Sequence, residues 1–250
     1  MNSAMYVIRK LEEALAQCRG GLGKKMSKGA AVSALDEAVA FYTGALEGTD
    51  GSGSGNLMHT LADKRCVNFK TCGREGNELT GTAKVNFEIF ELFDQMQLEL
   101  SGRAGRKNKE CAAAQMTKEK IVSLMYIPII QGAIRYAYIT ENAYSEKAEA
   151  EGAAFAAAVL PMVAACDEND ADIIYTNTKV GQQGSVSHAA VSGAFSRQYG
   201  CLGITCEDVG GLWDSAGADY YDGASPCVDT SPTPKPTKPG KKGMKGKKYI

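Results

Sequence analysis

The sequence has little of what a membrane-spanning or zinc-binding protein needs. Its longest apolar stretches, Ile121–Ile130 and Gly152–Ala165, are shorter than the roughly 18 residues that cross a bilayer, so we expect no transmembrane segment. Only two histidines are present, His59 and His188, and there is no Cys-x-x-Cys pair. A zinc finger or zinc ribbon is therefore excluded. Residues 1–17 are charged and amphipathic, without the apolar centre of a signal peptide.

Motifs of common enzyme sites are absent as well. The sequence contains no GxxxxGKS/T phosphate loop, no GxSxG nucleophile elbow and no HExxH metal motif, and no EF-hand pattern surrounds Asp50. The shortage of histidine also disfavours a histidine-based hydrolase or a zinc enzyme. We therefore expect that the protein is not an enzyme.

Most of the chain carries a net negative charge. The formal net charge is -1, yet residues 230–250 hold seven lysines and no acid, so the preceding 229 residues carry a charge of -8. A protein that binds nucleic acid places its positive charge on the folded surface, so we expect no such partner. The lysine-rich segment also holds four of the seven prolines and is typical of an extended chain. We predict a folded domain over residues 1–228 and a disordered Pro/Thr/Lys-rich tail over residues 229–250.

Cysteine, in contrast, is abundant. The eight cysteines are scattered along the chain, which is typical of a disulfide framework formed in an oxidising compartment. The alternative is a cytosolic chain with buried free thiols. Eight cysteines allow 105 connectivities, of which those with the close pairs Cys66/Cys72 and Cys201/Cys206 are the easiest to form. We expect disulfides and an extracellular, cell-surface or periplasmic location.

Helical periodicity dominates the apolar pattern, and alternating β patterns are scarce. The sequence therefore predicts an all-α fold, a multi-helix bundle with long irregular loops stapled by disulfides. Pro128 and Pro161 are expected to kink or interrupt two of the helices. The helices are expected over Tyr6–Cys18, from Ser27 or Ser33 to Leu46, and over Leu57–Cys66, Lys84–Leu100, Thr117–Ile139, Ser145–Ala165, Asp170–Thr176 and Ser187–Tyr199.

The side chains best suited to bind an ion are oxygen donors. The chain has 29 acids and 11 tyrosines, and ferric iron, a hard cation, takes carboxylate and phenolate oxygens. Arg135 and Tyr138 lie three residues apart on a predicted helix, so a guanidinium could hold an anion beside a phenol. Asp36 and Tyr42 lie about 120° apart around a helix and would need a bend to share an ion. The alternative is that such tyrosines belong to the core and such charges to the solvated surface.

Six segments resemble the low-iron-inducible periplasmic protein family of algae and diatoms, whose members are also called phytotransferrins. The resemblance runs from about Leu35 to Cys227, most of the predicted domain. It departs at His59-Thr60, where the family leads us to expect an aromatic residue such as tyrosine. The segments are Asp36–Gly44, Leu61–Cys66, Arg135–Tyr138, Ala148–Phe155, Ala158–Pro161 with Cys166, and Tyr220–Gly223 ending at Cys227.

The resemblance implies a cell-surface or periplasmic protein that binds ferric iron with carbonate as a synergistic anion. It implies no catalysis, and release of the metal on acidification. A membrane uptake system or a reductase would be its partner. On these segments the expected metal ligands are Asp36, Tyr42, Tyr136, Tyr138, Glu149 and Glu151. The expected anion-binding residues are Arg135, or Lys64 with Arg65.

A second interpretation remains open. The chain is then a structural protein of the cell wall or extracellular matrix, and the lysines of its tail bind acidic polysaccharide or silica. On this interpretation the helical domain serves only as a spacer. Iron binding by the helical domain and retention on an anionic matrix by the tail distinguish the two.

Overall fold

The computed structural model describes residues 2–20, 28–44, 57–101 and 107–229, and all structural statements concern these residues. Within them the protein is mostly helical, which confirms the predicted all-α class. The helices are α1 (Asn2–Cys18), α2 (Lys28–Thr43), α3 (Met58–Phe69), α4 (Lys84–Ser101), α5 (Lys107–Asn142), α6 (Glu146–Ala164), α7 (Glu168–Thr178), α8 (His188–Leu202) and α9 (Cys206–Val209). The predicted lysine-rich tail lies outside the described residues, apart from Asp229.

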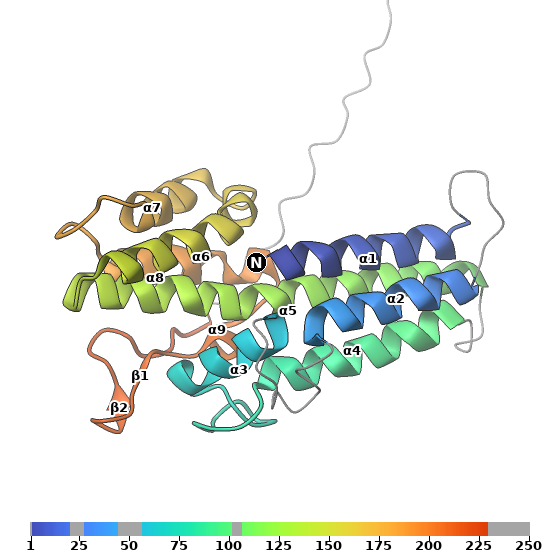
Figure 1. Cartoon of the computed structure of the whole chain (residues 1–250), viewed down its shortest axis with the longest axis horizontal. Coiled ribbons are helices and arrows are strands. Elements are labelled where there is room, and N and C mark those ends of the chain that lie inside the picture. The colour runs from blue at the N-terminus through green and yellow to red at the C-terminus, as the bar shows by residue number, and fades with distance from the viewer. Residues whose placement is uncertain (1, 21–27, 45–56, 102–106, 230–250) are drawn as a thin grey trace, which may run out of the picture.

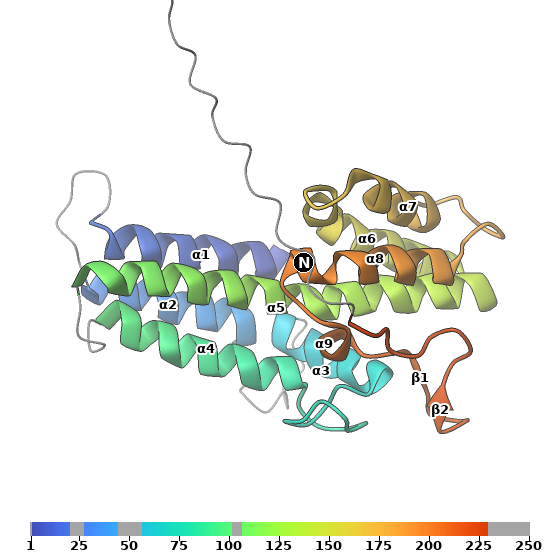
Figure 2. The same cartoon turned by 180° about the vertical axis from the view of Figure 1, so that it is seen from behind.

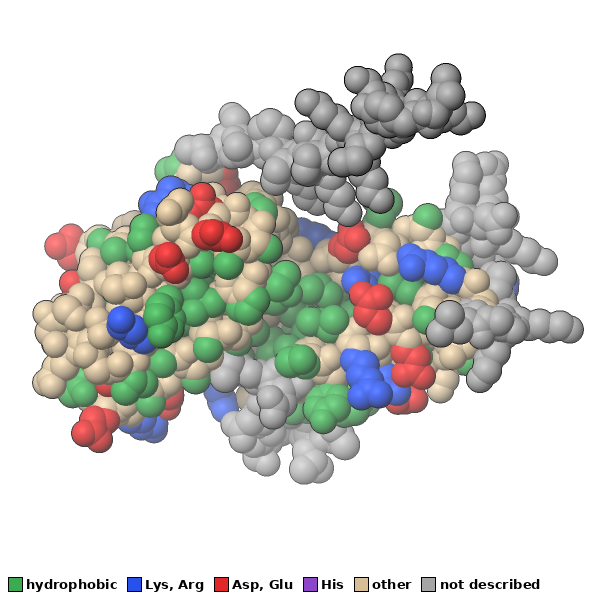
Figure 3. All heavy atoms as spheres, turned by 90° about the horizontal axis from the view of Figure 1, so that it is seen from above, with side chains coloured by type: hydrophobic (Ala, Val, Ile, Leu, Met, Phe, Trp, Pro, Cys, Tyr) green, Lys and Arg blue, Asp and Glu red, His purple; other side chains and the backbone are tan. Residues whose placement is uncertain are grey.

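The long helix α5 organises the fold. Its 36 residues span about 54 Å, and its N-terminal half packs with α1 and α4, whereas its C-terminal half packs with α6, α7 and α8 (Figures 1 and 2). Helices α3 and α9 lie beneath α5 near the middle of the molecule in Figure 1. A hairpin of β1 (Trp213–Asp214) and β2 (Asp219–Tyr220) lies beneath the group of α6, α7 and α8. Seen from above, hydrophobic side chains gather over the middle of the molecule, with acidic and basic ones to either side (Figure 3). Helix α3 contacts α2, α4 and α5.

Apolar spacing explains why these helices form. In α1, Val7, Leu11 and Leu15 recur every fourth residue and are fully buried, each contributing about 1.5–3 kcal/mol on burial. Ser145, where a helix was predicted to begin, caps α6, since its hydroxyl accepts a hydrogen bond from the backbone N–H of Ala148 at 3.1 Å. The sequence pattern thus locates most helices within a few residues.

The start of α5 was predicted wrongly. The helix begins at Lys107, ten residues before the predicted start at Thr117. The Thr117 hydroxyl lies inside the protein and donates to Glu99 Oε2 at 2.9 Å. The helix also continues through Pro128, because the buried residues around it outweigh the cost of about 3 kcal/mol for an internal proline. Pro161 likewise lies inside α6, which continues to Ala164.

Four disulfides use all eight cysteines. The predicted pair Cys66–Cys72 is confirmed and closes the irregular loop that follows α3. The predicted disulfide Cys201–Cys206 is wrong. Cys201 lies in the last turn of α8 and bonds to Cys166, whereas Cys206 lies at the start of α9 and bonds to Cys227. The other three bonds are Cys18–Cys111, Cys166–Cys201 and Cys206–Cys227. Four disulfides are typical of an extracellular protein.

None of the helices in the described ranges is both long and apolar enough to cross a membrane.

The contact between α5 and α6 depends on a glycine. A Cβ added to Gly132 would lie 2.6 Å from the ring of Phe155, which is stacked on Tyr136 with centroids 5.7 Å apart. We expect Gly132→Ala to destabilise the protein by about 1–3 kcal/mol in urea denaturation, despite the better helix propensity of alanine. Gly200→Ala is the matched control, since its added Cβ meets no atom within 4 Å. Equal effects of the two substitutions would contradict this packing.

Candidate functional site

Helix α3 contributes to two polar clusters. Asp63 and Arg65 are two residues apart, which turns them about 200° around the helix axis. Asp63 faces α2 and α4, where it joins Tyr42, His59 and Asn86 in what we call the histidine cluster. Arg65 faces α5 and α6, where it joins Arg135, Tyr136 and Glu151 in what we call the arginine cluster. The two clusters therefore lie on different sides of one short helix.

The arginine cluster is centred on the phenol of Tyr136. The guanidinium carbon of Arg135 lies 5.1 Å from the ring centroid of Tyr136, and that of Arg65 lies 5.9 Å from it. Glu151 and Arg65 lie close enough to the Tyr136 hydroxyl to affect its pKa. One phenol, one carboxylate and two guanidinium groups from three helices therefore converge.

The arginine cluster holds two like charges close together in a partly buried place. Burial lowers the pKa of Arg65, and the charge of Arg135 lowers it further. The Nε and Nη1 atoms of Arg65 are buried and have no hydrogen-bond partner. Burial raises the pKa of Tyr136, as does the neighbouring Glu151, while the two arginines oppose the shift. Buried guanidinium N–H groups without an acceptor fit an oxyanion, which they can bind with charge-assisted hydrogen bonds.

The structure gathers four of the nine predicted site residues, namely Arg65, Arg135, Tyr136 and Glu151. Asp36 and Lys64 instead point to solvent from α2 and α3. Asp36 therefore does not meet Tyr42, which is buried in the same helix. The expected site with all six oxygen ligands together does not form.

Glu149 has a different environment from Glu151. Its side chain is buried, and its Oε1 accepts hydrogen bonds from the backbone N–H groups of Gly181 at 2.9 Å and Gln182 at 2.8 Å. Tyr144 donates to Oε2 at 3.5 Å. Glu149 therefore holds the loop between α7 and α8, and it does not face the arginine cluster.

Tyr138 also lies apart from the arginine cluster. Its ring meets His188 edge-on, with centroids 5.3 Å apart, and lies 4.7 Å from the ring of Tyr221. Burial raises the pKa of Tyr138, and the neighbouring Tyr221 adds to the shift. The guanidinium of Arg135 lies over Tyr136, so the predicted pair of Arg135 and Tyr138 does not form.

The histidine cluster contains three residues that were not predicted as site residues from the sequence, namely His59, Asp63 and Asn86. The hydroxyl of buried Tyr42 donates to Asn86 Oδ1 at 2.5 Å, and Asn86 Nδ2 donates to Asp63 Oδ1 at 2.7 Å. His59 Nδ1 lies 3.5 Å from Asp63 Oδ2. Burial raises the pKa of Tyr42 well above its ordinary value, and the charge of Asp63 adds to the shift. The spacing of His59 and Asp63, one helical turn, was the available sequence signal.

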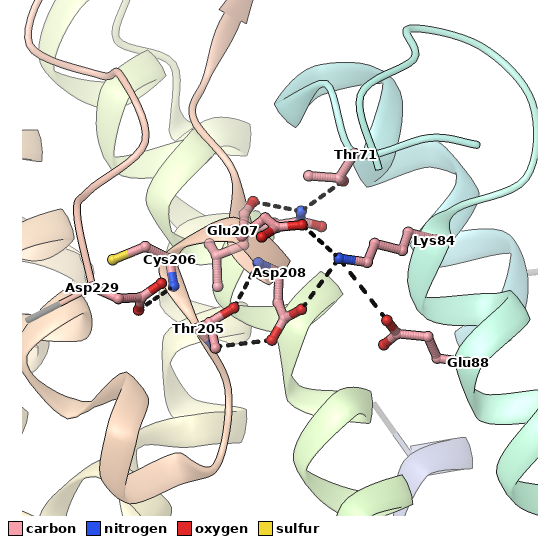
Figure 4. A network of polar contacts seen from close by, with 10 residues as sticks. Thr71, Lys84, Glu88, Thr205, Cys206, Glu207, Asp208 and Asp229 are labelled. Atoms are coloured by element: carbon pink, nitrogen blue, oxygen red, sulfur yellow. Dashed lines mark hydrogen bonds and ion pairs between the residues drawn. The ribbon is translucent and has the colours of Figure 1, made fainter. Parts of the chain in front are cut away.

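A third polar network holds α9 against the centre of the fold (Figure 4). Lys84 Nζ forms ion pairs with Glu207 at 3.0 Å, Asp208 at 3.8 Å and Glu88 at 4.0 Å. Burial raises the pKa of Glu88, and the charge of Asp208 adds to the shift. Because an ammonium already occupies the centre of these carboxylates, we assign the network to structure. Across the described ranges, no group of three or more His, Cys, Asp or Glu side chains is placed to hold a metal ion.

Acid is expected to weaken the fold through His188. This side chain is buried, and burial lowers its pKa, although Glu141 opposes the shift. A histidine kept neutral when folded binds more protons when unfolded, so the free energy of unfolding falls as pH drops below about 6.5. The loss should reach up to about 1.4 kcal/mol per pH unit in urea denaturation. His188→Gln should remove this part of the dependence, and an unchanged slope would contradict the assignment.

No family model, no curated protein and no solved structure matches the chain.

Proposed function

We propose that the protein binds ferric iron together with carbonate, at the arginine cluster, for high-affinity iron uptake at the cell surface or in the periplasm. The observation that carries the proposal is the buried guanidinium of Arg65, whose Nε and Nη1 lack a partner beside Arg135, Tyr136 and Glu151. The sequence resemblance to the low-iron-inducible periplasmic proteins and the four disulfides support it.

The chemistry follows from the charges. Two guanidinium groups alone repel a cation, but carbonate bound to them neutralises their two positive charges and leaves an oxygen for the metal. The phenolate of Tyr136 and the carboxylate of Glu151 are hard oxygen donors of the kind that Fe³⁺ takes. The charge of the metal offsets the raised pKa of the Tyr136 phenol, so binding releases its proton. Acidification protonates the carbonate and the ligands and releases the iron.

The role is that of a carrier and not of an enzyme. A carrier of this kind would deliver iron to a membrane uptake system or a reductase. The competing structural role, binding of an acidic polymer by the lysine-rich residues 230–250, concerns residues outside the described ranges.

The test is a ferric titration of the complete chain, with and without bicarbonate. We expect a phenolate-to-iron absorption band that saturates at one iron per chain and requires bicarbonate. The control is a chain that ends at residue 229, which should bind equally. Absence of the band, together with retention on an anionic matrix that depends on residues 230–250, would instead favour the structural role.

A further inference from the structure

We propose that the histidine cluster is a second metal site, which takes a divalent first-row ion such as Zn²⁺ through His59, Asp63 and Tyr42. This site is separate from the arginine cluster and does not depend on the proposed ferric function. It also supplies a role for His59, which stands where the resemblance led us to expect an aromatic residue.

The first argument is the state of the His59 ring. His59 is completely buried, and neither Nδ1 nor Nε2 has a hydrogen-bond partner. A buried polar group without a hydrogen-bond partner lowers the free energy of unfolding by about 1–3 kcal/mol. A ligand that binds the imidazole would remove this penalty. The ring meets Tyr42 and Phe90 edge-on, and its Nδ1 is directed at the carboxylate of Asp63.

The second argument is the spacing of the donor atoms. The 3.5 Å between His59 Nδ1 and Asp63 Oδ2 is long for a hydrogen bond. Two ligand atoms bound at about 2.1 Å to one tetrahedral ion lie about 3.4 Å apart. The nitrogen and the oxygen are therefore already separated as two ligands of such an ion would be.

The third argument is charge balance. A coordinated imidazole is neutral and Asp63 supplies one negative charge. Tyr42 would supply a second when metal binding releases to solvent the proton that it donates to Asn86 in the metal-free protein. A divalent ion leaves this buried cluster without net charge, whereas a trivalent ion leaves a positive charge where desolvation makes it costly. Imidazole together with oxygen donors suits Zn²⁺ and its neighbours.

Asn86 completes the site as an outer partner. It is fully buried, its Nδ2 donates to Asp63 Oδ1 at 2.7 Å and to the backbone oxygen of His59 at 3.1 Å, and its Oδ1 accepts from Tyr42. The backbone N–H of Ala83 also donates to Asp63 Oδ1 at 2.7 Å. These bonds orient the carboxylate so that Oδ2 faces His59, as outer partners do in known metal sites.

The test is a Zn²⁺ and Co²⁺ titration of the complete, disulfide-bonded chain after treatment with a chelator. We expect one ion per chain, and a Co²⁺ visible spectrum of four-coordinate intensity. His59→Gln and Asp63→Asn should each weaken Zn²⁺ binding by at least about tenfold, the lower range for loss of even an outer partner. His188→Gln is the matched control, since it removes the other buried imidazole and should leave binding unchanged. Bicarbonate and Tyr136→Phe should also have no effect, which separates this site from the ferric one.

Imidazole NMR serves as an independent measurement should the cluster variants not fold. In His188→Gln the single remaining histidine is His59, and its ring signals should shift on addition of Zn²⁺. No binding by the native chain, full binding by folded His59→Gln and Asp63→Asn, loss of binding in folded His188→Gln, or unshifted His59 signals would each overturn the proposal.

Discussion

Tyr136→Phe is expected to abolish the phenolate-to-iron absorption band and to lower ferric affinity by about tenfold or more. The substitution removes one oxygen and little volume, so the ring can keep its stacking on Phe155 and its place beside Arg65 and Arg135. The loss would therefore report on ligation and not on packing. The measurement is a ferric titration in bicarbonate, followed by visible absorption.

Tyr138→Phe is the matched control for this substitution. Tyr138 lies two residues along the same helix, but it packs on His188 and Tyr221. Its variant should bind iron as the native chain does. A band that persists in Tyr136→Phe, or that disappears only in Tyr138→Phe, would contradict the assignment of the phenolate.

Removal of the Cys18–Cys111 disulfide is expected to cause the largest loss of stability, about 4–5 kcal/mol. The bond joins α1 to α5 across 93 residues of sequence, and in the chain-entropy model the stabilisation grows with the loop that is closed. The variant Cys18→Ser/Cys111→Ser should show this loss in urea denaturation. Neither cysteine lies in the arginine cluster, so the folded variant should still bind iron.

The bond Cys66–Cys72 provides the comparison, because it closes only six residues of sequence. Its removal in Cys66→Ser/Cys72→Ser should cost about 2 kcal/mol by the same reasoning. Equal losses for the two double variants would show that loop length does not govern the effect in this protein.

The fold was largely predictable because its helices follow local apolar spacing. The errors arose where tertiary contacts overrule local signals. Thr117 has the character of a cap, but its hydroxyl is satisfied by Glu99 of α4 inside the bundle. Cys201 and Cys206 are close in sequence, yet a helix end separates them and each meets a distant partner.

The site was predictable only in part, because it depends on which helix lies opposite each residue. Arg135 and Tyr138 lie three residues apart in α5 and were predicted to share a face. In the structure α3 and α6 meet α5 at Tyr136, whereas His188 of α8 meets it at Tyr138. In the same way, Glu149 binds the loop between α7 and α8, whereas Glu151 lies in the arginine cluster. Two residues along a helix change the direction of a side chain by about 200°, and the sequence alone does not show which direction meets a partner.

The most direct test of the central claim is the ferric affinity measured over a series of bicarbonate concentrations, in the native chain and in Arg65→Gln. If carbonate bound to Arg65 creates the iron site, affinity in the native chain rises with bicarbonate and this rise is lost or greatly reduced in the variant. An affinity that does not change with bicarbonate, or that rises equally in both proteins, would contradict the account.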